Sequence, residues 1–123
     1  PDVKFDLNLK NYTETFNRAS LIVTDYSSIA FDFAYMKKPL IYYQFDGNYH
    51  FDVESAYFQY ERDGFGPVAR THEELRQCIF DLIESGCVMD EKYQKRVDDF
   101  FKYHDRNNSK RVYEEICNLD TYY

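Results

Sequence analysis

The sequence predicts an α/β fold, in which a short parallel β-sheet is flanked by helices and followed by a helical C-terminal part. Two short, continuous apolar runs at residues 21–23 and 40–43 are typical of strands buried in a parallel sheet. Residues 28–37 carry apolar side chains at helical spacing between these runs, and this order makes a right-handed βαβ unit. From residue 71 onward the apolar spacing is helical, which predicts the helical C-terminal part.

The first elements follow in this order along the chain. A short helix is expected over residues 10–19, where Tyr12, Phe16 and Ala19 recur at helical spacing, and a buried strand follows at residues 21–23. Pro39 ends the next helix, at residues 28–37, and residues 40–43 form the second strand. The core-facing side chains expected from that helix are Ile29, Phe33 and Met36, with Ala30 and Ala34 beside them.

The second half is predicted to be a long loop followed by three helices. Residues 44–70 lack a clear period and contain turn signals at residues 46–48 and 64–67. Thr71 and Glu74 fit a capping box that begins a helix, and Gly86 is placed to end it. The apolar stripes of the last two helices, which residues 107–109 separate, are Tyr93, Val97, Phe100 and Phe101, then Val112, Ile116 and Leu119.

The composition indicates one domain over residues 1–123 and argues against several functions. The length of 123 residues suits a single core. A formal net charge of −7 argues against nucleic-acid binding, which depends on neutralising phosphates. Cys78, Cys87 and Cys117 are odd in number and form no C-x-x-C pair, so we expect neither a disulfide framework nor a zinc site, and a cytosolic setting.

The chain is also expected to be part of a larger protein. It begins at Pro1, and its first clear elements resemble the middle of an alternating fold. No apolar run approaches the roughly 20 residues that span a bilayer, so any membrane association would be peripheral or depend on other parts of that protein.

The turn between the first strand and the next helix is the main candidate binding site. Ser27 and Ser28 bring hydroxyls and unpaired backbone N–H groups to a helix N-terminus, where the peptide dipoles favour a phosphate. Asp32 shares a helix face with Ser28 and leans back toward the turn. Because a carboxylate repels phosphate, Asp32 suits ligand hydroxyls or a cation. These residues predict a site for a molecule with a phosphate and a polyol, unless the serines only cap the helix.

Three further residues are weaker candidates for ligand contact. Asp25 lies at the carboxyl end of the first strand, where α/β sheets bind ligands, although it could instead cap the next helix. Gly66 and Pro67 could form a second ligand loop, but their turn lacks the G-x-G-x-x-G and Walker patterns and also reads as a tight turn.

No metal site or resident catalytic base is predicted with any specificity. His50, His72 and His104 lack metal-ligand spacing, and His50 alone is a candidate general base.

A series of short sequence motifs in a fixed order carries a family resemblance. These motifs are Thr24-Asp25-Tyr26-Ser27-Ser28, Phe31-Asp32-Phe33, Lys38-Pro39, Tyr42-Tyr43, Asp46, Tyr60-Glu61 and Gly66-Pro67. With them the chain resembles the CDP-glycerol glycerophosphotransferase family, the teichoic acid polymerases and primases of Gram-positive envelopes, with relatives in capsule synthesis. The similarity runs from about residue 6 to the last helix.

The resemblance implies a GT-B transferase, of which this chain would be the later half of the nucleotide-binding domain. Ser27 and Ser28 would contact the pyrophosphate of CDP-glycerol, and Asp32 its hydroxyls. Glycerol phosphate would pass to a hydroxyl of the growing polymer with release of CMP, and no cofactor is implied. The family's catalytic histidines lie in earlier segments, so this chain would hold no catalytic residue and be inactive alone. Its partners would be the missing N-terminal domain, the acceptor polymer and the inner face of the cell membrane.

Two other functions remain compatible with the residues. One is a GT-B glycosyltransferase that uses a nucleotide sugar, because Asp32 does not distinguish a polyol from a hexose. The other is a noncatalytic α/β interaction module in which Ser27 and Ser28 only cap a helix.

Overall fold

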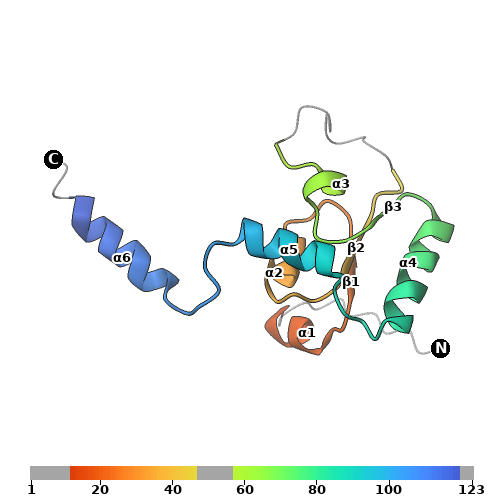
Figure 1. The fold of residues 1–123 in the computed structure, drawn as a ribbon, viewed down its shortest axis with the longest axis horizontal. Coiled ribbons are helices and arrows are strands. Elements are labelled where there is room, and N and C mark those ends of the chain that lie inside the picture. Colours follow the sequence, from red (N-terminus) through yellow and green to blue (C-terminus); the bar gives the residue numbers. More distant parts are fainter. Residues whose placement is uncertain (1–11, 47–56, 120–123) are drawn as a thin grey trace.

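A three-stranded parallel sheet forms the centre of the computed structural model, which describes residues 12–46 and 57–119. Its strands, β1 (Ile22–Thr24), β2 (Leu40–Tyr43) and β3 (Val68–Ala69), lie in the order β1-β2-β3 (Figure 1). Ile22 pairs with Leu40 and Tyr42 pairs with Val68, so all three carboxyl ends meet at one edge. The predicted turn with Ser27 and Ser28, called the serine turn below, follows β1 at this carboxyl edge of the sheet.

Helices cover both faces of the sheet, as Figure 1 shows. Helix α4 (His72–Glu84) contacts β2 and β3 on one side, and α2 (Ile29–Tyr35) contacts β1 and β2 on the other. Helix α5 (Glu91–Phe100) joins the α2 side through buried Val97, and α6 (Asn108–Leu119) extends away from the body. Two short helices, α1 (Tyr12–Arg18) and α3 (Tyr60–Asp63), lie beside the sheet.

The core lies between the sheet and the α2–α5 side. Phe33 of α2, Tyr42 of β2, Phe65 and Val97 are all fully buried there. Aromatic rings dominate this core: Phe65 packs against Phe31, and their ring centroids are 5.7 Å apart. Aromatic residues make up 20% of the sequence, and packing within the chain accounts for much of this content.

The predicted α/β class and most of its elements are confirmed, with local corrections. The prediction that residues 21–23 form a buried strand was wrong for Val23, which is 40% exposed because α4 packs mainly against β2 and β3. Met36 was wrong as a core residue: it is 37% exposed because α2 ends at Tyr35, one residue earlier. Residues 44–70 are not all loop, because they contain α3 and β3.

The predicted boundaries of α4 are confirmed. The Thr71 hydroxyl accepts a hydrogen bond from the Glu74 N–H at 3.2 Å. The Glu74 carboxylate, however, accepts from the Arg70 N–H at 2.7 Å and so reaches one residue before the cap. Gly86 follows the helix with a positive φ of 83°, as a glycine at this position does most easily.

Candidate functional site

The serine turn lies directly after β1 and is held by Asp25. An Asp25 carboxylate oxygen accepts a hydrogen bond from the Ser27 N–H at 3.1 Å, which fixes the turn as an Asx turn. The Ser27 hydroxyl oxygen accepts a long hydrogen bond, 3.4 Å, from the Ile29 N–H. Asp25 thus shapes the turn and does not bond to an N–H of α2 itself, and its predicted contact with a ligand stays a prediction.

Ser28 does not cap the helix. Its backbone is already helical, with φ −62° and ψ −15°, and its side chain makes no capping hydrogen bond. Within residues 12–46 and 57–119 no acceptor is found for the Ser28 N–H either. The turn therefore offers a free hydroxyl and a free amide from one residue, both of which can donate to an anion.

Asp32 faces the same pocket as the two serines. This pocket has a volume of about 390 Å³, and its walls are Tyr12, Phe16, Ser27, Ser28, Ile29 and Asp32. Asp32 is exposed, and no described residue hydrogen-bonds or pairs with its carboxylate. The structure thus brings Ser27, Ser28 and Asp32 together, with Asp25 behind the turn. The described residues that line this serine pocket include no lysine or arginine that could neutralise a phosphate.

Gly66 and Pro67 lie at the other end of the sheet, away from the turn. A Cβ on Gly66 would lie 2.0 Å from the Leu40 carbonyl oxygen, so only glycine fits there. The Pro67 carbonyl accepts a hydrogen bond from the Tyr42 N–H at 2.9 Å. These contacts give both residues a packing role, and their role in a second ligand loop stays a prediction.

Tyrosines from distant parts of the chain meet at the carboxyl edge of the sheet. The Tyr26 hydroxyl donates to Asp46 at 3.3 Å, and the Tyr60 hydroxyl donates to the Tyr26 carbonyl at 3.3 Å. Burial raises the pKa of Tyr26, with Asp46 adding to it, and burial followed by Asp25 raises the pKa of Tyr60. Both phenols therefore stay protonated and act as donors at neutral pH. Sequence spacing could not reveal this cluster.

Gln44, just beyond the end of β2, has a side-chain amide whose N–H donors find no acceptor among the described residues. Its side chain is 4% exposed, and its buried Nε2 has no hydrogen-bond partner among the described residues. Burying an amide without a partner is costly, so such groups are uncommon in folded proteins. The sequence carried no signal for it, because a lone glutamine after a strand has no motif.

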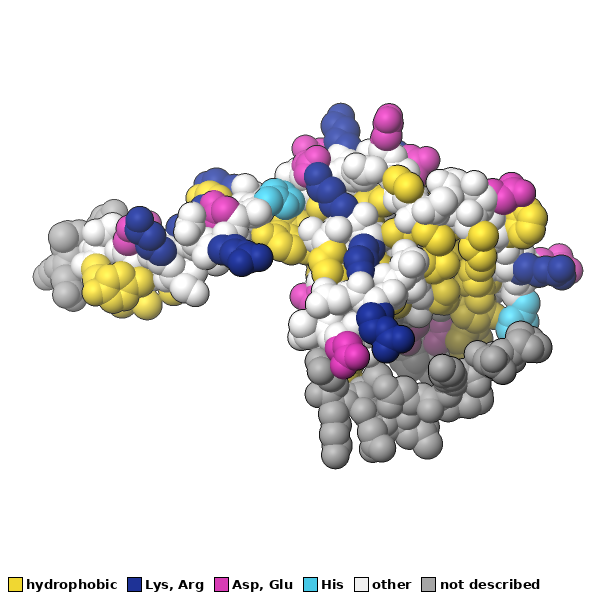
Figure 2. Space-filling model, turned by 90° about the horizontal axis from the view of Figure 1, so that it is seen from below, with side chains coloured by type: hydrophobic (Ala, Val, Ile, Leu, Met, Phe, Trp, Pro, Cys, Tyr) yellow, Lys and Arg dark blue, Asp and Glu magenta, His cyan; other side chains and the backbone are white. Residues whose placement is uncertain are grey.

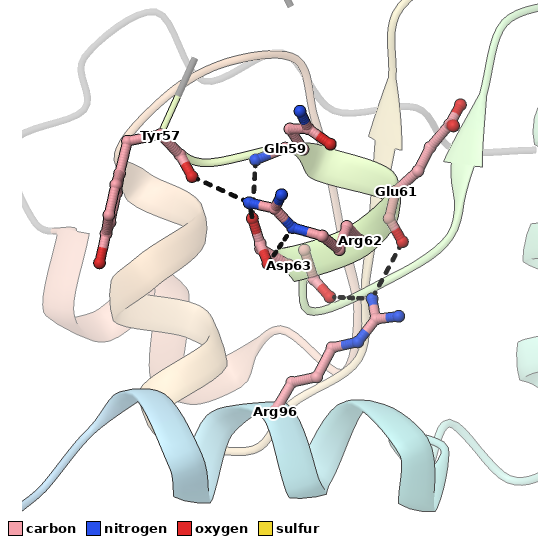
Figure 3. A network of polar contacts seen from close by, with 7 residues as sticks. Tyr57, Gln59, Glu61, Arg62, Asp63 and Arg96 are labelled. Carbon is pink, nitrogen blue, oxygen red and sulfur yellow. Dashed lines mark hydrogen bonds and ion pairs between the residues drawn. The ribbon is translucent and has the colours of Figure 1, made fainter. Parts of the chain in front are cut away.

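A second polar network, drawn in Figure 3, holds α3 against α5. Arg96 donates hydrogen bonds to the carbonyls of Gly64, at 2.8 Å, and Glu61, at 3.3 Å. Arg62 pairs with Asp63 at 2.6 Å, and this hydrogen bond lowers the pKa of the Asp63 carboxyl. Because these groups satisfy one another and the backbone, the network stabilises the fold and leaves no free cation for a ligand.

The surface charge and the arrangement of potential metal ligands bear on which ligands this chain could bind. Figure 2 shows acidic and basic side chains interspersed on one face, without a continuous basic surface. The described part of the chain contains no group of His, Cys, Asp and Glu residues that could hold a metal, and no helix there could cross a bilayer. His50, the candidate base, lies outside the described residues.

Comparison with known proteins assigns this chain to a family. The family model described as CDP-glycerol:poly(glycerophosphate) glycerophosphotransferase matches residues 3–118. The chain belongs to this family. The minor teichoic acid biosynthesis protein GgaB of Bacillus subtilis (strain 168) is 44% identical over 110 residues, which are 89% of this chain and 12% of GgaB. The teichoic acid poly(glycerol phosphate) polymerase of Bacillus spizizenii is 30% identical over 99 residues, which are 80% of this chain and 25% of that protein.

A solved structure shares the fold of this chain. The structure of the wall teichoic acid polymerase TagF matches 92% of this chain, and 28% of its own, with a TM-score of 0.64 at 23% identity. This likeness confirms the predicted α/β fold class, and the family model with the two relatives confirms the resemblance to the family. The chain spans about an eighth to a quarter of the length of the two curated relatives.

Proposed function

We propose that this chain is the donor-binding part of a transferase that moves glycerol phosphate from CDP-glycerol to a teichoic acid or capsule polymer. The observation that carries the proposal is the Ser28 hydroxyl in one pocket with the Asp32 carboxylate, neither with a partner among the described residues, in a chain of the glycerophosphotransferase family. A residue that only capped a helix would use its hydroxyl for that bond. The noncatalytic alternative is therefore less well supported.

Different side chains would contact different parts of the donor, CDP-glycerol. The hydroxyls of Ser27 and Ser28 and the Ser28 N–H would donate to the pyrophosphate. The Asp32 carboxylate would accept hydrogen bonds from the glycerol hydroxyls, one helical turn further on. Asp25 holds the Ser27 N–H and so positions the turn without touching the donor.

The reaction then balances as a phosphoryl transfer. An oxygen of the acceptor hydroxyl forms a bond to the phosphorus that carries glycerol, and the pyrophosphate P–O bond breaks with CMP leaving. The acceptor proton passes to a base that the described residues do not supply. Catalytic histidines in earlier segments, as the family resemblance implies, would provide it, so this chain alone would be inactive.

The rest of a longer protein would be the main partner. Strand β1 is an outer strand of the sheet, so a strand from another segment could pair with its backbone, and the exposed Val23 lies on a face that another segment could cover. Since the described lining of the serine pocket has no lysine or arginine, a phosphate there would receive its cations from another segment. We infer that the longer protein acts in the cytoplasm, peripherally at the inner face of the membrane.

Titration of the 123-residue chain, and of the longer protein, with CDP-glycerol and CMP tests the proposal. Saturable backbone amide shifts at Ser27, Ser28 and Ile29 are expected. Asp32→Asn should weaken CDP-glycerol more than CMP, whereas Asp99→Asn, an exposed aspartate on α5, should change neither. If neither CDP-glycerol nor CMP shifts the amide signals of the longer protein, the proposal is contradicted. If UDP-sugars shift them instead, the nucleotide-sugar alternative is established.

A further inference from the structure

A groove continues from the serine pocket along α2. It has a volume of about 540 Å³ and runs between α1, α2 and the linker that joins α5 to α6. Phe16 and Asp32 line both the groove and the serine pocket, so the two spaces adjoin at these side chains. A ligand in the groove would therefore reach the place that we assign to the glycerol of the donor.

The far part of the groove is built by the α5–α6 linker. The Tyr35 hydroxyl donates to the Tyr103 carbonyl at 3.2 Å, and the rings of Tyr35 and His104 stack at a centroid distance of 5.3 Å. Arg111 lies over the Tyr103 ring and pairs with Asp105, which fixes the linker from the α6 side. This wall is held by several specific contacts and is not a chance gap between helices.

A cation without an ionic partner lies on this wall. Lys102 lines the groove, and its ammonium contacts the Tyr103 ring at 5.1 Å from the centroid. Across residues 12–46 and 57–119 no carboxylate forms a salt bridge with it, although Lys37 and Arg111 nearby both have one. A lysine ammonium of this kind binds phosphate as a point charge.

The remaining lining suits a polyol. Phe100, which is 50% exposed, and Met36 offer apolar surface to carbon atoms, while the amide of Asn17 can exchange hydrogen bonds with hydroxyls. Apolar walls with a few convergent polar groups are typical of sites for small polar molecules. Of the described residues that line the groove, Asp32 alone has a carboxylate, and it lies at the donor end.

We propose that this groove binds the end of the acceptor polymer as a polyol phosphate, with Lys102 on its last phosphate and its terminal hydroxyl beside Asp32. The inference rests on the proposed function and adds the acceptor site to it. Asp32 and Tyr35 are three residues apart on α2, and the Tyr35 hydroxyl holds the carbonyl of Tyr103, the neighbour of Lys102. Asp32 and Lys102 thus line one groove, with the Tyr35–Tyr103 contact along its wall.

Steady-state kinetics of the longer protein with a poly(glycerol phosphate) oligomer as acceptor test the groove. Lys102→Gln removes the cation, and Asn17→Asp places a negative charge in the groove, where it would repel the bound polyol phosphate. Each should raise the acceptor KM about three- to tenfold and leave the CDP-glycerol KM unchanged. Lys95→Gln, an exposed lysine of α5 outside the groove, is the matched control and should change neither KM. In Lys102→Gln the acceptor KM should also depend less on salt.

Hydrogen exchange gives a readout that does not depend on turnover. Added oligomer should slow exchange at residues 100–103 without donor present. An unchanged acceptor KM in both variants, with normal CDP-glycerol binding, would overturn the groove assignment alone. Residues 100–103 that are already protected in the free longer protein, and unaffected by oligomer, would show that another segment fills the groove. If the unmodified protein binds neither CDP-glycerol nor CMP, the proposed function itself is contradicted, and the acceptor site with it.

Discussion

The ammonium of Lys38 lies 2.6 Å from the carbonyl oxygen of Phe16 and ties the start of β2 to the end of α1. The same nitrogen donates to the carbonyls of Asn17 and Ala19, each at 3.0 Å. The last carbonyls of a helix lack partners within the helix, and a positive charge there also meets the negative end of the helix dipole. Lys38 thereby holds α1, which supplies Tyr12 and Phe16 to the serine pocket.

Lys38→Met keeps the aliphatic stem and removes these three hydrogen bonds. We expect the free energy of unfolding to fall by about 2 kcal/mol, because bonds from a charged donor to half-buried carbonyls are lost. Cytidine nucleotide affinity should fall too, since Phe16 loses its anchor. Urea unfolding and a CMP titration measure the two effects, with Lys95→Met as control. An unfolding midpoint equal to that of the unmodified chain would show that the three bonds contribute nothing.

Ser28 and Thr71 provide a direct comparison of a free hydroxyl with a capping one. Thr71→Ala removes a real N-cap bond and should cost about 1 kcal/mol of stability. Ser28→Ala removes no bond within the described chain and should change stability by less than about 0.5 kcal/mol. Nucleotide affinity should respond in the opposite order, with Ser28→Ala the more damaging. If Ser28→Ala costs as much stability as Thr71→Ala, the capping interpretation is correct.

The parts of the fold that the sequence predicted are those that depend on local chemistry. Apolar periodicity located most of the helices and two of the strands, and the Thr71 cap and Gly86 terminator follow from side-chain and backbone preferences. Val23 was mispredicted because exposure of a strand depends on which helix covers it, which is a property of the whole chain. Strand β3 was missed because two residues, Val68 and Ala69, have no period to detect.

The candidate site shows the same division. Ser27, Ser28 and Asp32 are close in sequence, so helical geometry alone predicted that they share one pocket. The contacts of Tyr60 with Tyr26, and of Tyr35 with Tyr103, join segments 34 and 68 residues apart. Only tertiary packing creates such pairs, and a single sequence carries no local record of them.

Lys37 is predicted to be a point of backbone strain that glycine would relieve. It follows α2 with a φ of 54°, and its N–H donates to the Ala34 carbonyl at 2.8 Å, as the residue after a helix end commonly does. Lys37→Gly should therefore be more stable than Lys37→Ala by about 1 kcal/mol, since both lose the ion pair to Asp98 and only alanine keeps the strain. Thermal unfolding of the two variants measures the difference, and equal melting temperatures would contradict the assignment.

Gly66→Ala should destabilise the chain severely. The new methyl group would meet the Leu40 carbonyl at a distance that no relaxation of a side chain can relieve, so β2 and β3 must separate. We expect a loss of about 3 kcal/mol or more in urea unfolding. Gly86→Ala is the contrasting control, because nothing lies within 4 Å of its Cβ and only the positive φ opposes it. A Gly66→Ala chain as stable as Gly86→Ala would mean that the strands do not approach this closely.

Tyr42 should make the chain unstable in alkali. Burial raises the pKa of its phenol from 10.0 to about 12, and its oxygen accepts a hydrogen bond from the Phe65 N–H at 3.3 Å. Below pH 10 the phenol is protonated in both states, so its contribution is constant. Between pH 10 and about 12 the unfolded chain releases the proton while the folded chain retains it, so stability falls as pH rises, by on the order of 2–3 kcal/mol.

Tyr42→Phe separates this effect from general alkaline denaturation. The variant should be less stable at pH 8, because the buried Phe65 N–H loses its acceptor, but its stability should fall less steeply above pH 10. Tyr57→Phe is the matched control: Tyr57 is exposed and should leave the slope unchanged. Urea unfolding from pH 8 to pH 11.5 measures all three chains. Identical slopes for Tyr42→Phe and the unmodified chain would place the alkaline loss on other groups, of which Tyr26 and Tyr60 have the raised pKa to account for it.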